Sequence, residues 1–138
     1  MSVFRWLLIV SLCFVILFSV ARDMFEQSAT IPSVNAEQLE ELLEQGAALI
    51  DIRTEWEFRG GHIAGAQHIP IEQIFLEPDL IASHIEGGAV LYCHTGVRVD
   101  RLVDLLESKG FDTANLLHLE GDMRGWVSRG RAMASIDD

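Results

Sequence analysis

The sequence predicts an α/β fold in which a parallel sheet is flanked by helices on both faces. Three short, mostly apolar runs, at residues 47–50, 89–92 and 115–119, have the length and composition of buried strands. Segments with helical spacing of apolar residues separate them, and strands that alternate with helices favour a parallel sheet. The chain has 138 residues, of which 49% are hydrophobic, and this suits a single domain.

The first predicted helix begins after residue 34. Asn35 has a side chain that can cap a helix, and Gln38 lies three residues further on, which is the spacing of a capping box. Leucines at helical spacing give this segment an apolar face: Leu39, Leu42 and Leu43. Gly46 suits the C-terminal end of the helix.

The middle of the chain is expected to hold two strands and a helix. The strand at 47–50 ends near Asp51, and glycines mark the loop that follows: Gly60, Gly61 and Gly65. Residues 67–70 fit a second short strand. Residues 78–85 fit a helix that ends at a pair of glycines.

The second half of the chain continues the alternation. The strand at 89–92 runs directly into Cys93. Apolar residues at helical spacing then mark a helix that stops at Gly110: Val99, Leu102, Val103, Leu105 and Leu106. The last strand is predicted at 115–119 and the last short helix at 122–129.

The first 21 residues are interpreted as a targeting segment. Residues 6–21 carry no charged side chain, but at 16 residues they fall short of the roughly 20 needed to span a bilayer. They suit the apolar region of a secretory signal peptide, with small residues that permit cleavage after Ala21. An uncleaved membrane anchor is the alternative. We expect the chain to contact a membrane only through such an anchor. In both cases Arg5 favours a domain outside the cytoplasm.

The chain therefore divides into four parts. Residues 1–21 are the signal peptide or anchor, and residues 22–32 are a linker without a clear hydrophobic period. Residues 33–131 form the folded domain, and residues 132–138 are a C-terminal tail.

The charge and the cysteine content exclude some classes of function. The 21 Asp and Glu outnumber the ten Lys and Arg, and the net charge of -11 repels phosphate backbones, so we expect no nucleic-acid binding. Two cysteines cannot form a disulfide framework, and no Cys-x-x-Cys motif or helical pair of histidines predicts a metal site. We expect neither a metal nor a cofactor.

The segment from Tyr92 to Arg98 holds the candidate chemistry. Cys93 follows a buried strand and precedes a helix, and ligands of open α/β sheets bind at the carboxyl ends of strands. Backbone N–H groups in such a turn converge on one point and favour the thiolate of Cys93. Gly96 permits a backbone conformation that a β-carbon would oppose, and Arg98 adds a positive charge for an anionic substrate.

Cys93 alone has a simpler interpretation. A cysteine at the end of a buried strand often packs as a small hydrophobic residue. The Cys-x4-Arg spacing between a strand and a helix favours a nucleophile instead.

Three separated motifs give a resemblance to a known family. The first includes LIDIR and EFRGGHIAGA within residues 49–66, the second is the loop from Cys93 to Arg98, and the third is EGDMRGW at 120–126. In order and spacing they resemble the signatures of single-domain rhodaneses, which are sulfurtransferases. The chain departs from the family pattern at Ala64, where proline is usual, and at Asp122, where a second glycine is common.

The resemblance implies a rhodanese-like fold with the active-site loop between a central strand and a helix. Cys93 would take the outer sulfur of thiosulfate or a similar small sulfur-containing anion as a persulfide, and would pass it to cyanide or a thiol. The implied donor site is the loop itself: His94, Thr95, Gly96, Val97 and Arg98. Asp51 and Arg53 resemble residues that border the family's site, and a structural ion pair between them is the alternative.

The resemblance also has implications for partners and location. A short exported chain with one such domain is similar to the small periplasmic rhodaneses of the phage-shock type. This similarity implies a monomer in a bacterial periplasm, working without a cofactor.

Two details of the loop bear on its substrate. Six residues from Cys93 to Arg98 match the sulfurtransferases, whereas related phosphatases surround phosphate with a longer loop, so a phosphate or arsenate enzyme is disfavoured. His94 replaces the lysine or arginine common in thiosulfate-preferring members, and a histidine is only partly charged near neutral pH. Val99 replaces a small or hydroxylated residue. We therefore expect thiosulfate to be a mediocre donor.

Two other functions remain open at this stage. The domain could be a persulfide carrier without turnover, or a rhodanese-like interaction module. Larger side chains of the motifs are expected to pack in the core: Trp56, Phe58, Met123 and Trp126. His62 is expected to brace a loop through hydrogen bonds.

Overall fold

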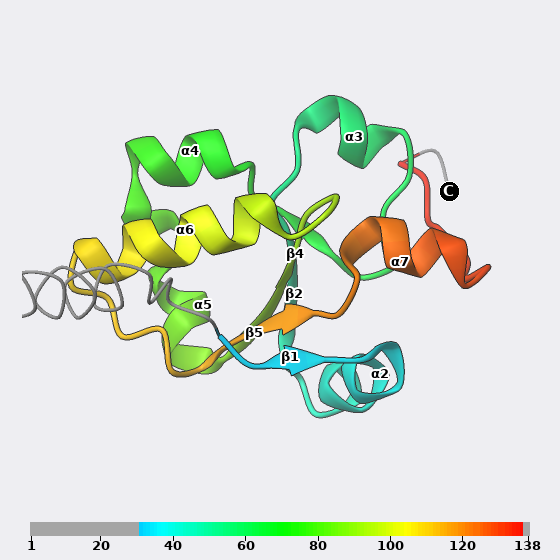
Figure 1. The fold of residues 1–138 in the computed structure, drawn as a ribbon, viewed down its shortest axis with the longest axis horizontal. Helices are drawn as coiled ribbons and strands as arrows, with labels where there is room; N and C mark the ends of the chain where they lie inside the picture. Colours follow the sequence, from blue (N-terminus) through cyan, green and yellow to red (C-terminus); the bar gives the residue numbers. More distant parts are fainter. Residues whose placement is uncertain (1–30, 137–138) are drawn as a thin grey trace, which may run out of the picture.

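The predicted strands form the centre of a parallel sheet in the computed structural model, which describes residues 31–136. Within this range the sheet has five strands in the order β1-β5-β4-β2-β3, and all their pairings are parallel (Figure 1). Their bounds are β1 Ser33–Val34, β2 Ala48–Asp51, β3 Gln67–His68, β4 Ala89–Tyr92 and β5 Leu116–Leu119. The strand β4, which leads to Cys93, is therefore central, as expected.

Helices cover both faces of the sheet, and this confirms the predicted fold class. One apolar cluster joins β2 and β4, through Ile50 and Leu91, to residues of the helices on that face. Those helices are α4 Ile71–Leu76, the 3₁₀ helix Pro78–Ile81, α5 Ala82–Gly87 and α6 Val97–Ser108. The second cluster joins Leu49 and Val90 to the opposite helices, α2 Ala36–Glu44 and α7 Asp122–Ser128. Successive strand residues thus face opposite clusters, which is why the strands are apolar throughout.

The first helix begins as the sequence predicts. Asn35 accepts a hydrogen bond from the Gln38 N–H at 2.8 Å, and the Gln38 side chain accepts one from the Asn35 N–H at 2.9 Å. The helix ends at Glu44, and Gly46 has a φ of +90°, a conformation that favours glycine. The capping box and the terminal glycine are both confirmed.

Three elements differ from the predictions or were missed. β1 was missed because a two-residue edge strand is too short to show a hydrophobic period. The helix α4 begins directly after Pro70 and precedes the predicted helix at 78–85. That predicted helix is divided into a 3₁₀ turn and α5.

The helix α3, Glu55–Arg59, was also missed, although the sequence signals its start. Thr54 accepts a hydrogen bond from the Glu57 N–H at 3.3 Å, and the Glu57 carboxylate accepts one from the Thr54 N–H at 3.1 Å. This is a second capping box. The five-residue helix has no buried residue, so it lacks the apolar stripe by which helices are usually recognised.

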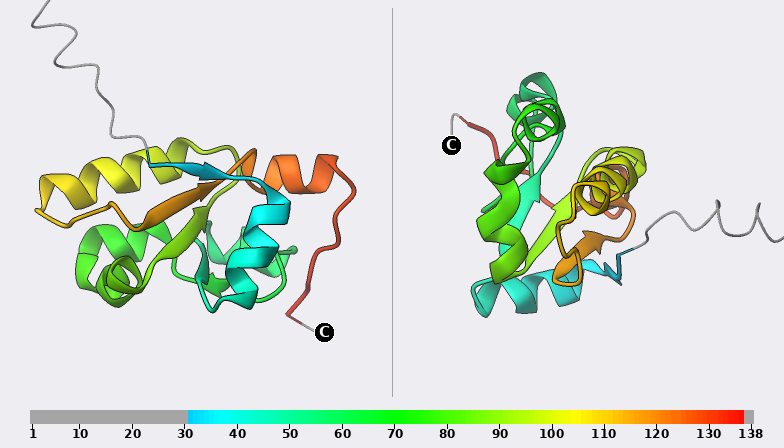
Figure 2. Two further views of the ribbon diagram at one scale, coloured as in Figure 1. Left: turned by 90° about the horizontal axis from the view of Figure 1, so that it is seen from below. Right: turned by 90° about the vertical axis from the view of Figure 1, so that its left-hand side faces the viewer.

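The chain after α7 returns to the domain rather than leaving it (Figure 2). The Trp126 indole donates a hydrogen bond to the Ala132 carbonyl at 2.8 Å. His62 and Ala134 exchange two backbone hydrogen bonds, of 3.0 and 2.8 Å. The segment expected to be a tail is therefore attached to the glycine loop up to residue 134.

The expectation for Trp56 is wrong. Its side chain is 85% exposed on α3, whereas Met123 and Trp126 are buried as predicted. The targeting segment at 1–21 lies outside the described residues. Within residues 31–136, no helix combines the length and the hydrophobicity needed to span a membrane.

Candidate active site

Cys93 lies at the carboxyl end of the central strand, where the chain turns into α6. The residue is 1% exposed, and its Sγ accepts a hydrogen bond from the Gly96 N–H at 3.1 Å. A backbone N–H that points at the sulfur stabilises negative charge there. The turn therefore supplies one of the donors that the sequence predicts for a Cys93 thiolate.

Gly96 is required by the backbone of this turn. Its φ is +94°, which residues with a β-carbon rarely adopt. A β-carbon at this position would lie 3.2 Å from both Asp122 Oδ2 and His118 Cε1. The glycine thus allows the loop to lie close against these two side chains.

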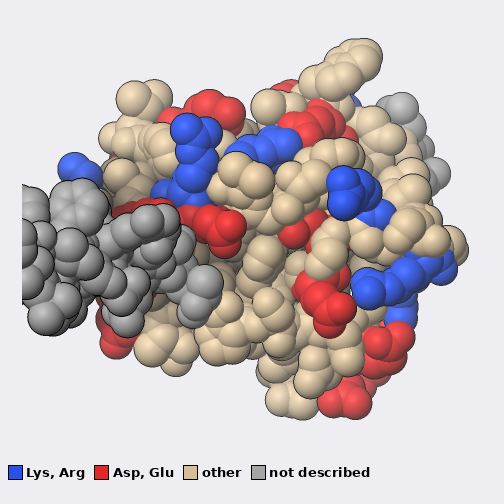
Figure 3. Space-filling model, viewed as in Figure 1, with Lys and Arg blue, Asp and Glu red and all other residues tan. Residues whose placement is uncertain are grey.

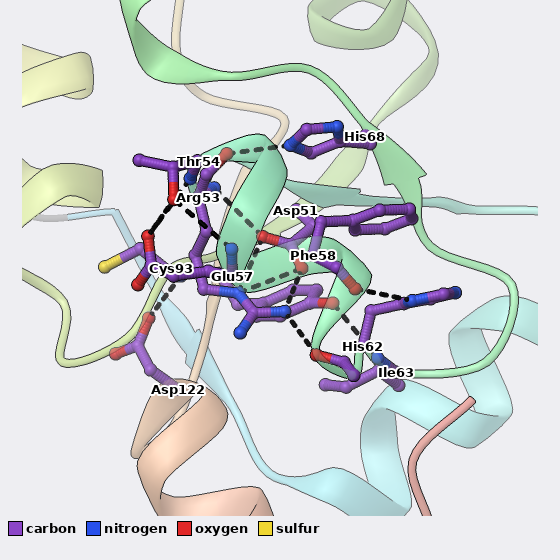
Figure 4. A network of polar contacts seen from close by, with 12 residues as sticks. Asp51, Arg53, Thr54, Glu57, Phe58, His62, Ile63, His68, Cys93 and Asp122 are labelled. Carbon is purple, nitrogen blue, oxygen red and sulfur yellow. Dashed lines mark hydrogen bonds and ion pairs between the residues drawn. The ribbon is translucent and has the colours of Figure 1, made fainter. Parts of the chain in front are cut away.

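Asp122 supports the loop that carries Cys93, a role that was not predicted. Its side chain is buried, and its Oδ1 accepts the Cys93 N–H at 2.7 Å (Figure 4). Its φ of +54° is the left-handed conformation, which gives a physical reason for the glycine that the resemblance led us to expect here. An aspartate at a position where glycine is common indicates a specific contact, because such a contact must offset the strain of the left-handed conformation.

His118 completes this support. Its Nε2 lies 2.9 Å from Asp122 Oδ2, and the two residues are four apart, on β5 and at the start of α7. The hydrogen bond to Asp122 raises the pKa of His118 above its ordinary value of 6.5, against the opposing effect of burial. Cys93, Asp122 and His118 thus form a chain of contacts from the loop to β5.

Arg98 is held by a carboxylate of α3. Its two terminal nitrogens each lie 2.7 Å from an oxygen of Glu57, which is a bidentate pair across 41 residues of sequence. The Arg98 guanidinium lowers the pKa of Glu57 from 4.5 to about 2. An anionic donor at Arg98 would therefore compete with Glu57, and the donor-binding role of Arg98 stays a prediction.

Asp51 and Arg53 form a buried ion pair. Arg53 Nη2 lies 2.6 Å from Asp51 Oδ2, and the side chains are 4% and 0% exposed. The same nitrogen donates to the Gly61 carbonyl at 2.8 Å. This geometry agrees with the structural alternative, because the pair attaches the glycine loop to β2.

Two histidines brace the same region, as expected for His62. The His62 ring stacks on Phe58 at a centroid distance of 3.9 Å, and its Nδ1 lies 3.1 Å from the Phe58 carbonyl oxygen. The His68 ring also stacks on Phe58, at a centroid distance of 4.4 Å, and its Nε2 lies 2.8 Å from the Arg53 carbonyl oxygen. Phe58 therefore packs between histidines rather than in the main core.

A cleft of about 500 Å³ opens beside the loop, between α3 and α7. The residues that line it are Arg53, Trp56, Glu57, Gly60, Gly61, His94, Met123, Arg124, Val127, Ser128 and Met133. His94 is the predicted loop residue that reaches this cleft, while Thr95 and Val97 are exposed on the loop and at the start of α6. Within residues 31–136, no group of His, Cys, Asp and Glu side chains is arranged to hold a metal.

Comparisons with known proteins agree with this fold. The model of the rhodanese-like domain family matches residues 35–129. The probable adenylyltransferase/sulfurtransferase MoeZ of Mycobacterium tuberculosis is 34% identical over 112 residues, which are 80% of this chain and 28% of MoeZ. YqhL of Bacillus subtilis is 34% identical over 86 residues, which are 62% of this chain and 65% of YqhL. The chain thus spans less than two thirds of either relative.

Solved structures show the same architecture. The human single-domain sulfurtransferase TSTD1 superposes with a TM-score of 0.57 at 26% identity, covering 72% of this chain and 98% of TSTD1. A rhodanese-like domain protein from Staphylococcus aureus gives a TM-score of 0.58 at 28% identity, covering 76% and 98% of the two chains.

The fold and the loop define a parallel α/β domain with a cysteine presented at the carboxyl end of its central strand. Together with the family match, they assign the chain to a class of sulfurtransferase-related domains. The chain belongs to the rhodanese-like family.

Proposed function

We propose that the protein transfers sulfane sulfur through a persulfide on Cys93. In the first step the Cys93 thiolate attacks the outer sulfur of a donor such as thiosulfate, the S–S bond of the donor breaks, and sulfite leaves with the electron pair. In the second step cyanide or a thiolate attacks the terminal sulfur of the persulfide. The products are thiocyanate or a new persulfide, and the Cys93 thiolate is restored.

The loop is suited to hold the charges of both steps. The Gly96 nitrogen lies 3.1 Å from Sγ, which carries the negative charge before the first step and again after the second. The buried Asp122 carboxylate accepts the Cys93 N–H and so fixes the backbone that carries the sulfur. The contact between Gly96 and Sγ is the observation that carries the proposal.

The test is intact-protein mass spectrometry of the full chain, before and after thiosulfate, with cyanide added last. A gain of one sulfur atom that cyanide reverses is expected for the wild type. Cys93→Ser should show no gain, because serine cannot form a persulfide, and its fold can be checked by circular dichroism. A gain of sulfur in that variant at a site other than Cys13 would contradict the mechanism.

A persulfide carrier is the second candidate function, and the Arg98–Glu57 pair favours it. The pair occupies the guanidinium that would otherwise bind a small anionic donor. A carrier would be loaded slowly by thiosulfate and faster by another persulfide. Steady-state rates with both donors separate the two functions, since an enzyme turns over many times and a carrier loads once.

We also propose that the domain acts outside the cytoplasm as a monomer. The apolar residues 6–21 and the single charge before them support export. Cell fractionation with an antibody against the domain tests the location, and the mass of the processed chain shows whether cleavage follows Ala21.

A further inference from the structure

The structure places a buried carboxylate directly beside the residue on which a thiolate must form. Asp122 Oδ1 accepts the Cys93 N–H at 2.7 Å, and the Asp122 side chain is buried. A second negative charge close to the sulfur disfavours the thiolate, and this effect is larger where water is excluded. The carboxylate therefore fixes the cysteine backbone but opposes the charge that the reaction needs.

His118 is placed to offset this charge. Its Nε2 lies 2.9 Å from Asp122 Oδ2, the second oxygen of the same carboxylate. A β-carbon on Gly96 would lie 3.2 Å from His118 Cε1, so the ring lies against the residue whose nitrogen is 3.1 Å from Cys93 Sγ. A protonated His118 ring thus brings positive charge to the turn that holds the sulfur.

The other charged groups near this ring and near the sulfur do not replace the histidine. Asp100 of α6 adds a second negative charge near the ring and favours its protonated form. The neighbouring strands β1 and β4 contribute no acidic or basic residue. Arg98 acts on Cys93, but Glu57 holds it in a bidentate pair. Basic and acidic side chains are interspersed over the face in Figure 3, so no broad patch of one sign there outweighs the local charges.

From this arrangement we infer that His118 is a positioning residue for sulfur transfer, because its proton neutralises the Asp122 carboxylate and so allows a thiolate on Cys93 beside it. This inference rests on the proposed function and names how its site is regulated, by the proton on His118. Neither His118 nor Asp122 has to contact the donor. The raised pKa of His118 means that the ring carries this proton at pH 6.

The test measures how fast iodoacetamide alkylates Cys93 in the full chain at pH 6, where His118 is charged. Iodoacetamide is neutral, so its rate follows the thiolate and not the attraction of a charged reagent. Peptide mass spectrometry separates the modification of Cys93 from that of Cys13. His118→Gln can still donate a hydrogen bond to Asp122 but carries no charge, and it should slow alkylation about fivefold to tenfold.

A double variant distinguishes this charge effect from a structural role. In His118→Gln, Asp122→Asn the amide oxygen can still accept the Cys93 N–H, and asparagine tolerates the left-handed backbone of residue 122. Because the opposing carboxylate is also gone, alkylation should return to within about twofold of the wild-type rate. If the two side chains served the structure alone, the second substitution would slow alkylation further or leave it unchanged.

His84→Gln is the matched control. His84 lies on α5, which precedes the opposite end of β4, so its loss should leave the rate of Cys93 alkylation unchanged. Circular dichroism shows whether each variant is folded. A wild-type rate in folded His118→Gln, or a double variant that is no faster than His118→Gln, would overturn the inference.

A measurement on the wild type alone applies even if a variant fails to fold. Coupling between two charges is reciprocal, so alkylation of Cys93, which removes its thiolate, should lower the pKa of His118 in an NMR titration. An unchanged titration would overturn the inference. Neither measurement needs a sulfur donor, so a chain that gains no sulfur from thiosulfate would contradict the proposed function and leave the coupling of His118 to Cys93 to these two results.

Discussion

At the scale of single residues, the environment of Cys93 depends on contacts between distant parts of the sequence. The loop, its cysteine and its glycine are recognisable because they are consecutive. Asp122 and Glu57 are not, because they meet Cys93 and Arg98 across 29 and 41 residues. The sequence shows Asp122 only as a departure at a glycine position, and its φ of +54° gives that departure a physical reason.

Asp122 controls the protonation of His118. Asp122→Asn keeps an oxygen for the Cys93 N–H but removes the negative charge, so the pKa of His118 should fall toward its ordinary value of 6.5 or below. An NMR titration of the histidine rings measures this pKa. A titration of His118 that is the same in both proteins would contradict the pairing with Asp122.

The same pair makes stability depend on pH. The pKa of His118 is raised in the folded state, so the contribution to the free energy of unfolding is fully present below 6.5 and is lost as pH rises through the folded value. Denaturant titrations of the wild type across this window should show that loss. His118→Gln should not show it, and a matching decrease in the variant would assign the effect to another group.

Gly96 gives a matched pair of glycine substitutions. Gly96→Ala should cost roughly 1–3 kcal/mol for the backbone conformation, and more because its β-carbon presses against Asp122 and His118. Gly46→Ala shares the positive φ but meets nothing within 4 Å. Denaturant unfolding should therefore show a larger loss for Gly96→Ala, with slower or altered alkylation of Cys93 in that variant alone. Equal losses would argue against the close contact.

At the scale of elements, the strongly patterned segments were predictable, whereas β1, α3 and α4 were missed. The helix α2 and the strands β2 and β4 are identified by caps and apolar runs. The helix α3 has no buried residue, so its position follows from its capping box and from the contacts of Glu57 with Arg98. Prediction from the spacing of buried apolar residues therefore cannot detect an exposed helix that lines a cleft.

The ion pair between α3 and α6 should make the stability of the domain decrease in acid. The pKa of Glu57 is lowered to about 2 in the folded state, so the contribution is present above 4.5 and is lost as pH falls from there toward 2. Glu57→Gln should be less stable at neutral pH and should lose less stability over that acid range. Glu41→Gln, on the exposed side of α2, controls for the loss of a charge. An equal loss of unfolding free energy over the acid range in Glu57→Gln and the wild type would contradict the stabilising role of the ion pair.

At the scale of the whole molecule, the C-terminal segment packs back against α7 and the glycine loop. Truncation after residue 131 removes the Ala132 acceptor of Trp126 and the backbone pairing of His62 with Ala134. Leaving such groups unpaired should cost roughly 1–3 kcal/mol of unfolding free energy. Truncation after residue 136 leaves both contacts in place and serves as the control. Equal thermal stability of the two truncated proteins would show that the segment is only peripheral.

The two edge strands have a consequence for aggregation. β1 and β3 contain two residues each, so the edges of the sheet present few free N–H and C=O groups to another chain. The hydrophobic strands β2, β4 and β5 are enclosed between them. Long exposed edges act as templates for intermolecular strand pairing, whereas short ones do not. While it stays folded, the domain keeps its most amyloid-prone segments away from neighbouring molecules.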